Sequence, residues 1–310
     1  MEESVVKVEH LSHRYSVQWA IKDISFEIEN KGVVGLLGSN GAGKSTTMNI
    51  MCGVLNQTEG RVFLNGVDLR ENPVEAKRHI GFLPQRPPLY PDLTVEEYLT
   101  LCAHLRLVNK KQVGKAVKIA LERCAISHFS KRLIRNLSGG YQQRVGIAQA
   151  IVHNPRFVVL DEPTNGLDPN QIVDIRHLIR ELAKEHAVML STHILPEVQA
   201  TCQRVMMIEH GQVVFSGAME DFDNYILPDT FVVTLENPPQ VELLQELPGI
   251  IQVEQLEPTR FRMKFREQAD ITCRLVELSV RNAWRLSEVQ LERGSLDEVF
   301  AQLSGKKSRN

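Results

Sequence analysis

The stretch GSNGAGKS, from Gly38 to Ser45, decides the fold of this 310-residue chain. It fits the pattern Gly-x-x-x-x-Gly-Lys-Ser/Thr, with the apolar run VVGLL before it and the helical stretch TTMNIMCGVL after it. Glycines allow successive backbone N–H groups to face an anion, and the N-terminus of the following helix adds its dipole. This order of strand, loop and helix predicts a phosphate-binding loop in an α/β domain.

Two side chains of this loop carry specific expectations. We expect the Lys44 ammonium to reach the β- and γ-phosphates of a nucleotide, and the Ser45 hydroxyl to ligate Mg²⁺, which prefers oxygen ligands. The alternative is a glycine-rich turn with an exposed lysine, and the flanking strand and helix argue against it. The expected nucleotide-binding residues of the loop are Gly38, Ser39, Asn40, Gly41, Ala42, Gly43, Lys44, Ser45 and Thr46.

A second segment, FVVLDEP from Phe157 to Pro163, ends an apolar run with two acids. Such a run is typical of a buried parallel strand, which would deliver Asp161 and Glu162 to the carboxyl edge of the sheet, where ligands gather. We expect Asp161 to hold the metal through water, and Glu162 to orient the attacking water or accept its proton. Without a phosphate loop, two solvated acids at a strand end would be the better interpretation.

Between these segments stands LSGGYQQR, beginning at Leu137. Ser138, Gly139 and Gly140 open a helical stretch, so they form a second helix N-terminus that can approach a phosphate closely. One chain has little need of two such sites for one nucleotide. With these motifs in this order, the chain resembles the ATP-binding cassette (ABC) family, in which an LSGGQ-type signature covers the γ-phosphate bound to the partner cassette. Tyr141 stands at the position of the usual glutamine.

The same resemblance implies roles for four further residues. Gln85, in IGFLPQRPP, resembles the Q-loop glutamine, which contacts Mg²⁺ and the attacking water. His193, in VMLSTH, resembles the switch histidine that keeps the γ-phosphate and Glu162 in register. Asp168, in GLDP, resembles the aspartate that crosses the dimer interface, and Tyr15 resembles the aromatic residue that stacks on adenine.

The resemblance covers about residues 4 to 220 and implies an ATP hydrolase that uses ATP and Mg²⁺. It also implies a homodimer of cassettes that drives a separate integral-membrane permease, with the chain in the cytoplasm at the inner face of the cell membrane. Loops and the C-terminal part look most like type-2 exporter ATPases, especially gliding-motility-associated ones. Three prolines stiffen the segment RPPLYPDLT, which is either a docking surface for the permease or a connector.

Two other classes of function compete with this one. A soluble ABC-type ATPase could serve translation, chromosome maintenance or cofactor assembly. However, the chain has one cassette where translation-type members usually carry two, and the 94 residues from Lys44 to Ser138 hold no sustained heptad for a chromosome-type coiled coil. A protein that binds nucleotide without turnover is disfavoured because Glu162 and His193 are both present.

Composition agrees with the transporter interpretation. A net charge of −2 and a pI near 6.6 give no cationic field, so we expect no nucleic-acid partner. Five cysteines without close pairing or metal-ligand spacing suit a reducing compartment. No signal pattern opens the chain, and no stretch approaches the roughly 20 apolar residues of a spanning helix.

The expected organisation is one cassette at residues 1–227 and a small accessory domain at 228–310. In the cassette we expect an antiparallel sheet from residues 4–30 and 60–69, with a turn at Asn65-Gly66, beside a mixed central sheet. A helical subdomain should fill residues 91–135, opened by a Thr94–Glu97 capping box. After Pro228 the order βαββαβ predicts a ferredoxin-like domain at about 229–293, a final helix from Leu296, and a basic tail that is solvated or drawn to an anionic membrane.

Overall fold

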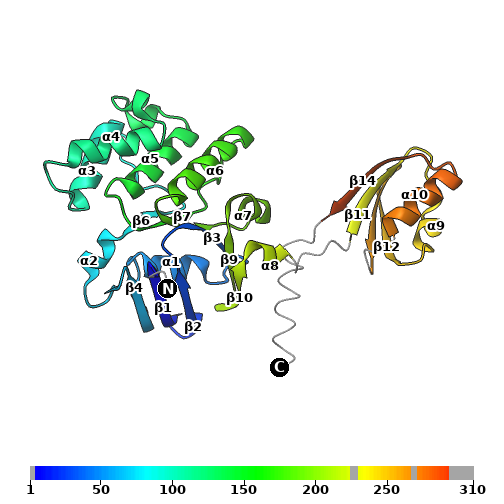
Figure 1. Cartoon of the computed structure of the whole chain (residues 1–310), viewed down its shortest axis with the longest axis horizontal. Coiled ribbons are helices and arrows are strands. Elements are labelled where there is room, and N and C mark those ends of the chain that lie inside the picture. The colour runs from blue at the N-terminus through cyan, green and yellow to red at the C-terminus, as the bar shows by residue number, and fades with distance from the viewer. Residues whose placement is uncertain (1–3, 224–229, 267–270, 293–310) are drawn as a thin grey trace. The chain divides into compact units, whose positions relative to one another are not determined.

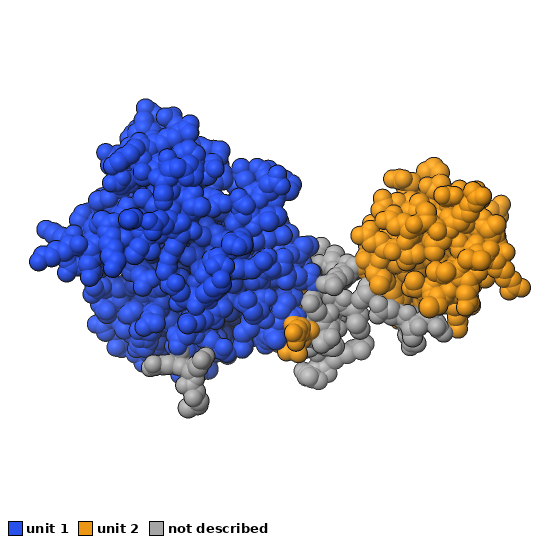
Figure 2. Space-filling model, turned by 45° about the horizontal axis from the view of Figure 1, so that its top comes forward, with its two compact units in different colours: residues 1–219 blue, residues 220–310 orange. Residues whose placement is uncertain are grey.

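A computed structural model describes residues 4–223, 230–266 and 271–292. The chain forms two compact units, residues 1–219 and 220–310 (Figures 1 and 2). The division falls earlier than the boundary expected between residues 227 and 228, and the expected final helix and basic tail lie outside the described residues. Within the described ranges, no helix combines the length and apolar character that crossing a membrane requires.

A six-stranded sheet in the order β10-β9-β3-β8-β7-β6 forms the centre of unit 1. All neighbours pair in parallel except β10 with β9. The four apolar residues of β7 before its acid are at most 1% exposed, which confirms the buried parallel strand expected there. The strands are β3 (Gly32–Leu37), β6 (Ile80–Leu83), β7 (Phe157–Asp161), β8 (Ala187–Ser191), β9 (Arg204–Glu209) and β10 (Gln212–Ala218).

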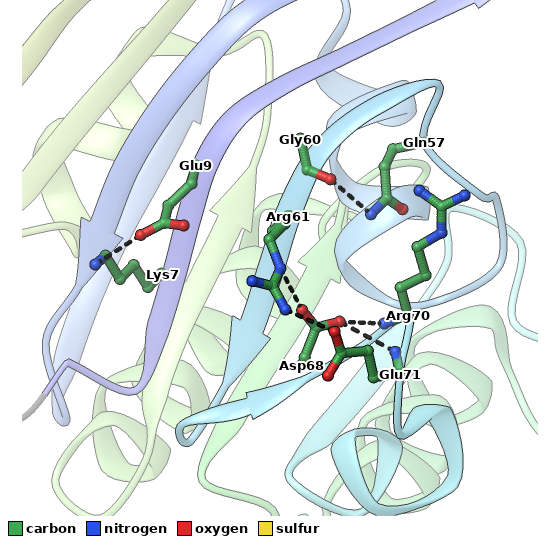
Figure 3. A network of polar contacts seen from close by, with 8 residues as sticks. All are labelled: Lys7, Glu9, Gln57, Gly60, Arg61, Asp68, Arg70 and Glu71. Atoms are coloured by element: carbon green, nitrogen blue, oxygen red, sulfur yellow. Dashed lines mark hydrogen bonds and ion pairs between the residues drawn. The ribbon is translucent and has the colours of Figure 1, made fainter.

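A second, antiparallel sheet in the order β2-β1-β4-β5 packs in the same unit. Asn65 and Gly66 both have positive φ and turn β4 into β5, as the Asn-Gly dipeptide predicts. In Figure 3, the Arg61 guanidinium donates to Asp68 at 2.7 Å, and Asp68 also accepts from the backbone N–H of Arg70 at 2.8 Å. The strands are β1 (Val6–Tyr15), β2 (Gln18–Ile28), β4 (Glu59–Leu64) and β5 (Val67–Asp68).

Three helices of unit 1 form a cluster of their own. Figure 1 shows α3, α4 and α5 clustered away from the antiparallel sheet, as the helical subdomain predicts. The capping box is confirmed, because Thr94 Oγ1 accepts from the Glu97 N–H and the Glu97 carboxylate accepts from the Thr94 N–H. The helices are α1 (Lys44–Met51), α2 (Pro73–Arg78), α3 (Val95–Leu105), α4 (Val113–Arg123), α5 (Gly139–Ile151), α6 (Pro169–Ala183) and α7 (Leu195–Thr201), and α8 (Met219–Asp223) follows β10 at the boundary of the units.

Unit 2 has the predicted βαββαβ order and an antiparallel sheet in the order β12-β13-β11-β14. This is the ferredoxin-like arrangement. Its own apolar core contains Phe231, Phe261, Met263 and Leu275, so the unit does not depend on the core of unit 1. The elements are β11 (Thr230–Leu235), α9 (Val241–Gln245), β12 (Ile250–Glu257), β13 (Arg260–Phe265), α10 (Ile271–Arg281) and β14 (Leu286–Glu292).

Candidate nucleotide-binding and hydrolysis site

The glycine-rich loop leaves the carboxyl end of β3 and enters α1, as its sequence predicts. Gly43 caps the helix with φ of 110°, and a Cβ atom there would lie 2.8 Å from the Ala20 carbonyl oxygen. A Cβ atom at Gly38 would lie 2.4 Å from the Ile208 carbonyl oxygen. Both ends of the loop therefore require glycine, one of them for its backbone conformation as well as for space.

Lys44 is a buried cation inside this loop, with 8% of its surface exposed. Its ammonium donates to the carbonyl oxygens of Gly38 at 2.7 Å and Ser39 at 3.0 Å. Burial lowers the pKa of Lys44, and the charges of Glu162, Asp161 and Glu209 oppose that change. The loop thus concentrates donors and positive charge at one end of α1, which is the field that a phosphate group needs.

A cavity of about 360 Å³ lies beside the loop. Tyr15 is 53% exposed, and its ring meets the His13 ring edge-on at 4.8 Å between centroids. The structure therefore brings the predicted aromatic residue and the phosphate loop to one cavity. Its lining comprises Tyr15, Gln18, Trp19 and Ala20 from the β1–β2 hairpin, and Asn40, Gly41, Gly43, Lys44, Ser45 and Thr46 from the loop and α1.

The two acids stand at the carboxyl end of β7. Glu162 has φ of 50°, a left-handed conformation that is strained for a residue other than glycine. Its N–H donates to the Ser191 carbonyl at 2.9 Å, which holds the strained residue against the end of β8. Burial raises the pKa of Asp161, and the Glu162 charge adds to that rise whereas Lys44 opposes it.

His193 lies beside Glu162, with its Nδ1 atom 2.8 Å from Glu162 Oε1. The histidine follows β8, and β8 is the parallel neighbour of β7, so the two strands end at the same edge of the sheet. Glu162 has 12% of its side chain exposed and His193 has 56%. A hydrogen bond from an imidazole to a carboxylate fixes the orientation of the carboxylate. Because His193 is the more exposed of the two, an incoming ligand can reach the pair from the histidine side.

Two other predicted site residues, Gln85 and Asp168, make no hydrogen bond to Glu162 or His193 within the described part of the chain. Gln85 is exposed just after β6, and within the described ranges its side chain makes no hydrogen bond. Asp168 caps α6, because its Oδ1 atom accepts from the N–H groups of Asn170 and Gln171, both at 3.0 Å. Asp168 therefore has a local role in the chain itself, as a helix cap.

The signature begins α5 elsewhere in the unit. Ser138 is the N-cap, and its hydroxyl makes no capping hydrogen bond. A Cβ atom at Gly140 would lie 2.7 Å from the side-chain amide of Gln171, so a larger residue there would displace the end of that flexible side chain. The signature lines a separate cavity of about 220 Å³ that shares no residue with the cavity beside the phosphate loop: Ala125, Gly140, Tyr141, Arg144, Gln171, Asp174 and Ile175.

Glu209 is a site residue that the sequence interpretation missed. It ends β9 with 8% of its surface exposed, and the Ser39 hydroxyl donates to its two carboxylate oxygens at 2.9 and 3.0 Å. The carboxylate thus holds the second residue of the phosphate loop. The signal was present, because an acid that ends an apolar strand is the same pattern that identified Asp161.

Comparison with known proteins places this architecture in a family. The family model described as ABC transporter matches residues 21–165. The chain is 33% identical to the ABC transporter ATP-binding protein YxlF of Bacillus subtilis, over 75% of this chain and 77% of that protein. The chain belongs to the ABC transporter family, as an ATP-binding, ATP-hydrolysing subunit.

Two other relatives carry more specific names. The bacitracin transport ATP-binding protein BcrA of Bacillus licheniformis is 35% identical, over 68% of this chain and 69% of that protein. The linearmycin resistance ATP-binding protein LnrL of Bacillus subtilis is 26% identical, over 99% of this chain and 100% of that protein. The second match extends through both units.

Solved structures match the cassette. The chain of cbiO1 from Clostridium perfringens, part of the ABC transporter complex cbiONQ, has a TM-score of 0.66 and 30% identity, covering 72% of this chain and 92% of that one. A dimeric ATP-binding cassette in a post-hydrolysis state, bound to ADP and Pi, has a TM-score of 0.62 and 26% identity, covering 69% of this chain and 98% of that one. The fold and the enzymatic class predicted from the motifs are therefore confirmed.

Proposed function

We propose that this chain is the ATP-hydrolysing subunit of an exporter, and that two copies form a dimer that drives a separate membrane permease. BcrA is named for bacitracin transport and LnrL for linearmycin resistance, and a resistance role supports export as the direction of transport. The dimeric neighbour and the neighbour from a transporter complex support the two kinds of partner. Such a subunit would lie in the cytoplasm, at the inner face of the membrane, held there by the permease.

One observation in particular supports the proposal that two copies form a dimer. The phosphate loop and the signature are both helix N-termini suited to phosphate, yet no residue of the signature lines the cavity beside the phosphate loop. A second copy related by a two-fold axis would complete both sites at once, because such an interface places the same surface patch of each copy against the other. Asp168, at the start of α6, would then contribute at that interface as well as capping its own helix.

The arrangement supports a division of labour in hydrolysis. Lys44 and the loop N–H groups would hold the phosphates, and Tyr15 would stack on the adenine. Glu162 would act as general base toward water, oriented by His193, and Gln85 would complete the contacts to the attacking water. Ser138, Gly139 and Gly140 of the partner copy would cover the γ-phosphate, where they add donors to the developing charge.

The donors at this edge fit Mg²⁺. Among the described residues, no three His, Cys, Asp or Glu side chains form a cluster that could hold a metal. The Ser45 hydroxyl would ligate the ion, Asp161 would hold it through water, and Gln85 would contact it, and such oxygen donors are typical of Mg²⁺. The ion would neutralise phosphate charge, and it would offset the burial that raises the pKa of Asp161.

The helical subdomain offers a surface for the permease. Leu101 and Leu105 stand one turn apart on α3 and are 36% and 70% exposed. Tyr90, in the proline-stiffened loop before α3, is 55% exposed, and its ring lies 6.0 Å from the Tyr98 ring. The two exposed leucines on one face of α3 and the exposed Tyr90 in the preceding loop support a docking role for this region over a connector role.

Purification of the tagged chain from gently solubilised native membranes tests the proposal. We expect a polytopic membrane protein at equal stoichiometry. Leu105→Glu should release that protein while MgATP turnover of the isolated chain persists, whereas Val280→Glu, at an equally exposed apolar residue of unit 2, should not release it. Recovery only from the soluble fraction, with ribosomes, DNA-bound proteins or assembly factors, would contradict a transporter subunit and favour the soluble class of ABC ATPase.

A further inference from the structure

A buried carboxylate lies behind the hydrolysis site. Glu197, on α7, is only 3% exposed, and two threonine hydroxyls are its hydrogen-bond partners. The Thr164 hydroxyl lies 2.8 Å from both of its carboxylate oxygens, and the Thr192 hydroxyl lies 3.2 Å from Oε2. Both threonines are themselves buried, at 5% and 0% exposed. An acid at such a depth requires donors, because a buried carboxylate without them is strongly unfavourable.

The two threonines belong to the two segments that carry the chemistry. Thr164 lies in the loop from Glu162 to Asp168, two residues after the proposed base. Thr192 immediately precedes His193, and its hydroxyl also accepts from the Ile194 N–H at 3.1 Å. The Glu197 N–H in turn donates to the Ile194 carbonyl at 3.1 Å, so α7 begins directly from this turn. One carboxylate thus bonds to both segments.

The cationic partner of Glu197 is distant. Arg176, on α6, has its nearest guanidinium nitrogen 4.0 Å from Glu197 Oε1, and the buried Nε of Arg176 has no hydrogen-bond partner among the described residues. Hydroxyl hydrogen bonds, and not a close ion pair, are therefore the short contacts of the carboxylate. Charge-assisted hydrogen bonds are short and directional, so they fix the positions of the groups that donate them.

We propose that Glu197 is a positioning residue for ATP hydrolysis: by holding Thr164 and Thr192 together, it keeps Glu162 and His193 in register and links that pair to the loop of Asp168. This inference rests on the proposed roles of Glu162 and His193. The strained backbone of Glu162 requires support from its surroundings, and the Thr164–Glu197 contact lies two residues away on the same loop.

Steady-state kinetics on the full chain test the proposal. Glu197→Gln should lower kcat about 10-fold and change KM for MgATP less than about twofold, because the interaction matters for the reacting geometry and not for nucleotide binding. Thr164→Val should lower kcat similarly, and Thr164→Ser should restore it. The double variant Thr164→Val with Glu197→Gln should lose no more than either single change, because both remove one coupled unit.

Thr201 provides a matched control on the same helix. It is 3% exposed, and its hydroxyl has no hydrogen-bond partner among the described residues, so Thr201→Val should leave kcat unchanged. A lower Tm with unchanged kcat, a loss carried by KM, or additive losses in the double variant would each overturn the inference. The role of Glu162 as general base is tested separately, and full MgATP turnover in Glu162→Gln would contradict it. Should Glu197→Gln not fold, the Thr164 pair decides the matter alone.

Discussion

Unit 1 buries charged side chains such as Lys44 and Glu197, both less than a tenth exposed, whereas unit 2 keeps its ion pairs at the surface. In unit 2, Arg262 pairs with Glu292 at 2.8 Å, with side chains 40% and 36% exposed, and Ser279 is the only buried polar side chain among its described residues. The buried charges of unit 1 lie at and behind the candidate hydrolysis site. Burial of charge is unfavourable unless partners compensate, so it marks where function is concentrated.

The backbone shows the same contrast. In unit 1, Glu162 holds a left-handed conformation at the end of a buried strand, where strain is tolerated because β7 and β8 fix both sides. In unit 2, the described positive-φ residues other than glycine, Ala283 and Arg285, lie in the turn between α10 and β14. Single polar changes at the candidate site of unit 1 should therefore impair turnover, whereas apolar changes in the core of unit 2 should lower only the stability of that unit.

The largest expected effect is at the proposed base. Glu162→Gln should lower kcat for MgATP by roughly 10²- to 10⁴-fold, because it removes proton acceptance while keeping the shape of the side chain. The same variant should accumulate an ATP-bound dimer in size-exclusion chromatography. Glu185→Gln, a change of the same chemistry at a surface acid of the same unit, is the control and should behave as wild type. Equal turnover in both variants would remove Glu162 from its role.

A mixing experiment tests whether the two helix N-termini of unit 1 act across a dimer. Lys44→Ala should abolish turnover by removing the buried cation, and Ser138→Arg should abolish it by blocking the signature. Mixed dimers of the two variants would contain one site with both parts intact, because each chain supplies what the other lacks. Measured turnover should therefore reappear on mixing. A mixture as inactive as its components would contradict assembly in trans.

Unit 2 should lose stability without loss of chemistry. Phe261→Ala, in its core, should cost about 3–5 kcal/mol, as cavity-creating changes of this kind do. We expect its melting transition to fall, seen in the emission of Trp284, which packs against that core, while MgATP turnover of unit 1 changes little. The matched change Phe157→Ala, in β7, should instead impair turnover. Loss of turnover in Phe261→Ala would show that the units are coupled.

The smallest expected effect is on the pH dependence of the Tm, through the carboxylate of Asp68. Burial raises the pKa of Asp68, but the N–H groups of Glu71 and Arg70 and the Arg61 guanidinium outweigh it and hold the pKa below its usual value. A depressed pKa means that this carboxylate stabilises the fold above its unfolded pKa, and that the contribution is lost as pH falls through the folded value. Asp68→Asn should lower the Tm at pH 7 and flatten its decline below about pH 4. An unchanged acid profile would contradict this.

The fold was largely predictable because its signals are local. The phosphate loop, the capping box of Thr94 and Glu97, the Asn65-Gly66 turn and the βαββαβ order of unit 2 each depend on neighbours in sequence. The division between the units was less predictable, since it depends on which residues pack together, and it falls between Met219 and Glu220.

Some features of the candidate site likewise follow from the sequence, whereas others depend on the tertiary structure. The sequence by itself determined the phosphate loop, the two acids at the carboxyl end of β7 and the family, because spacing along the chain carries those motifs. The family resemblance also implied that His193 and Glu162 act together, and the structure places His193 Nδ1 2.8 Å from Glu162 Oε1. Only the tertiary structure decided that Glu209 holds Ser39 and that Glu197 joins Thr164 to Thr192. Contacts of this kind connect residues that become neighbours only when parallel strands end at one edge of a sheet, and no local pattern records that register.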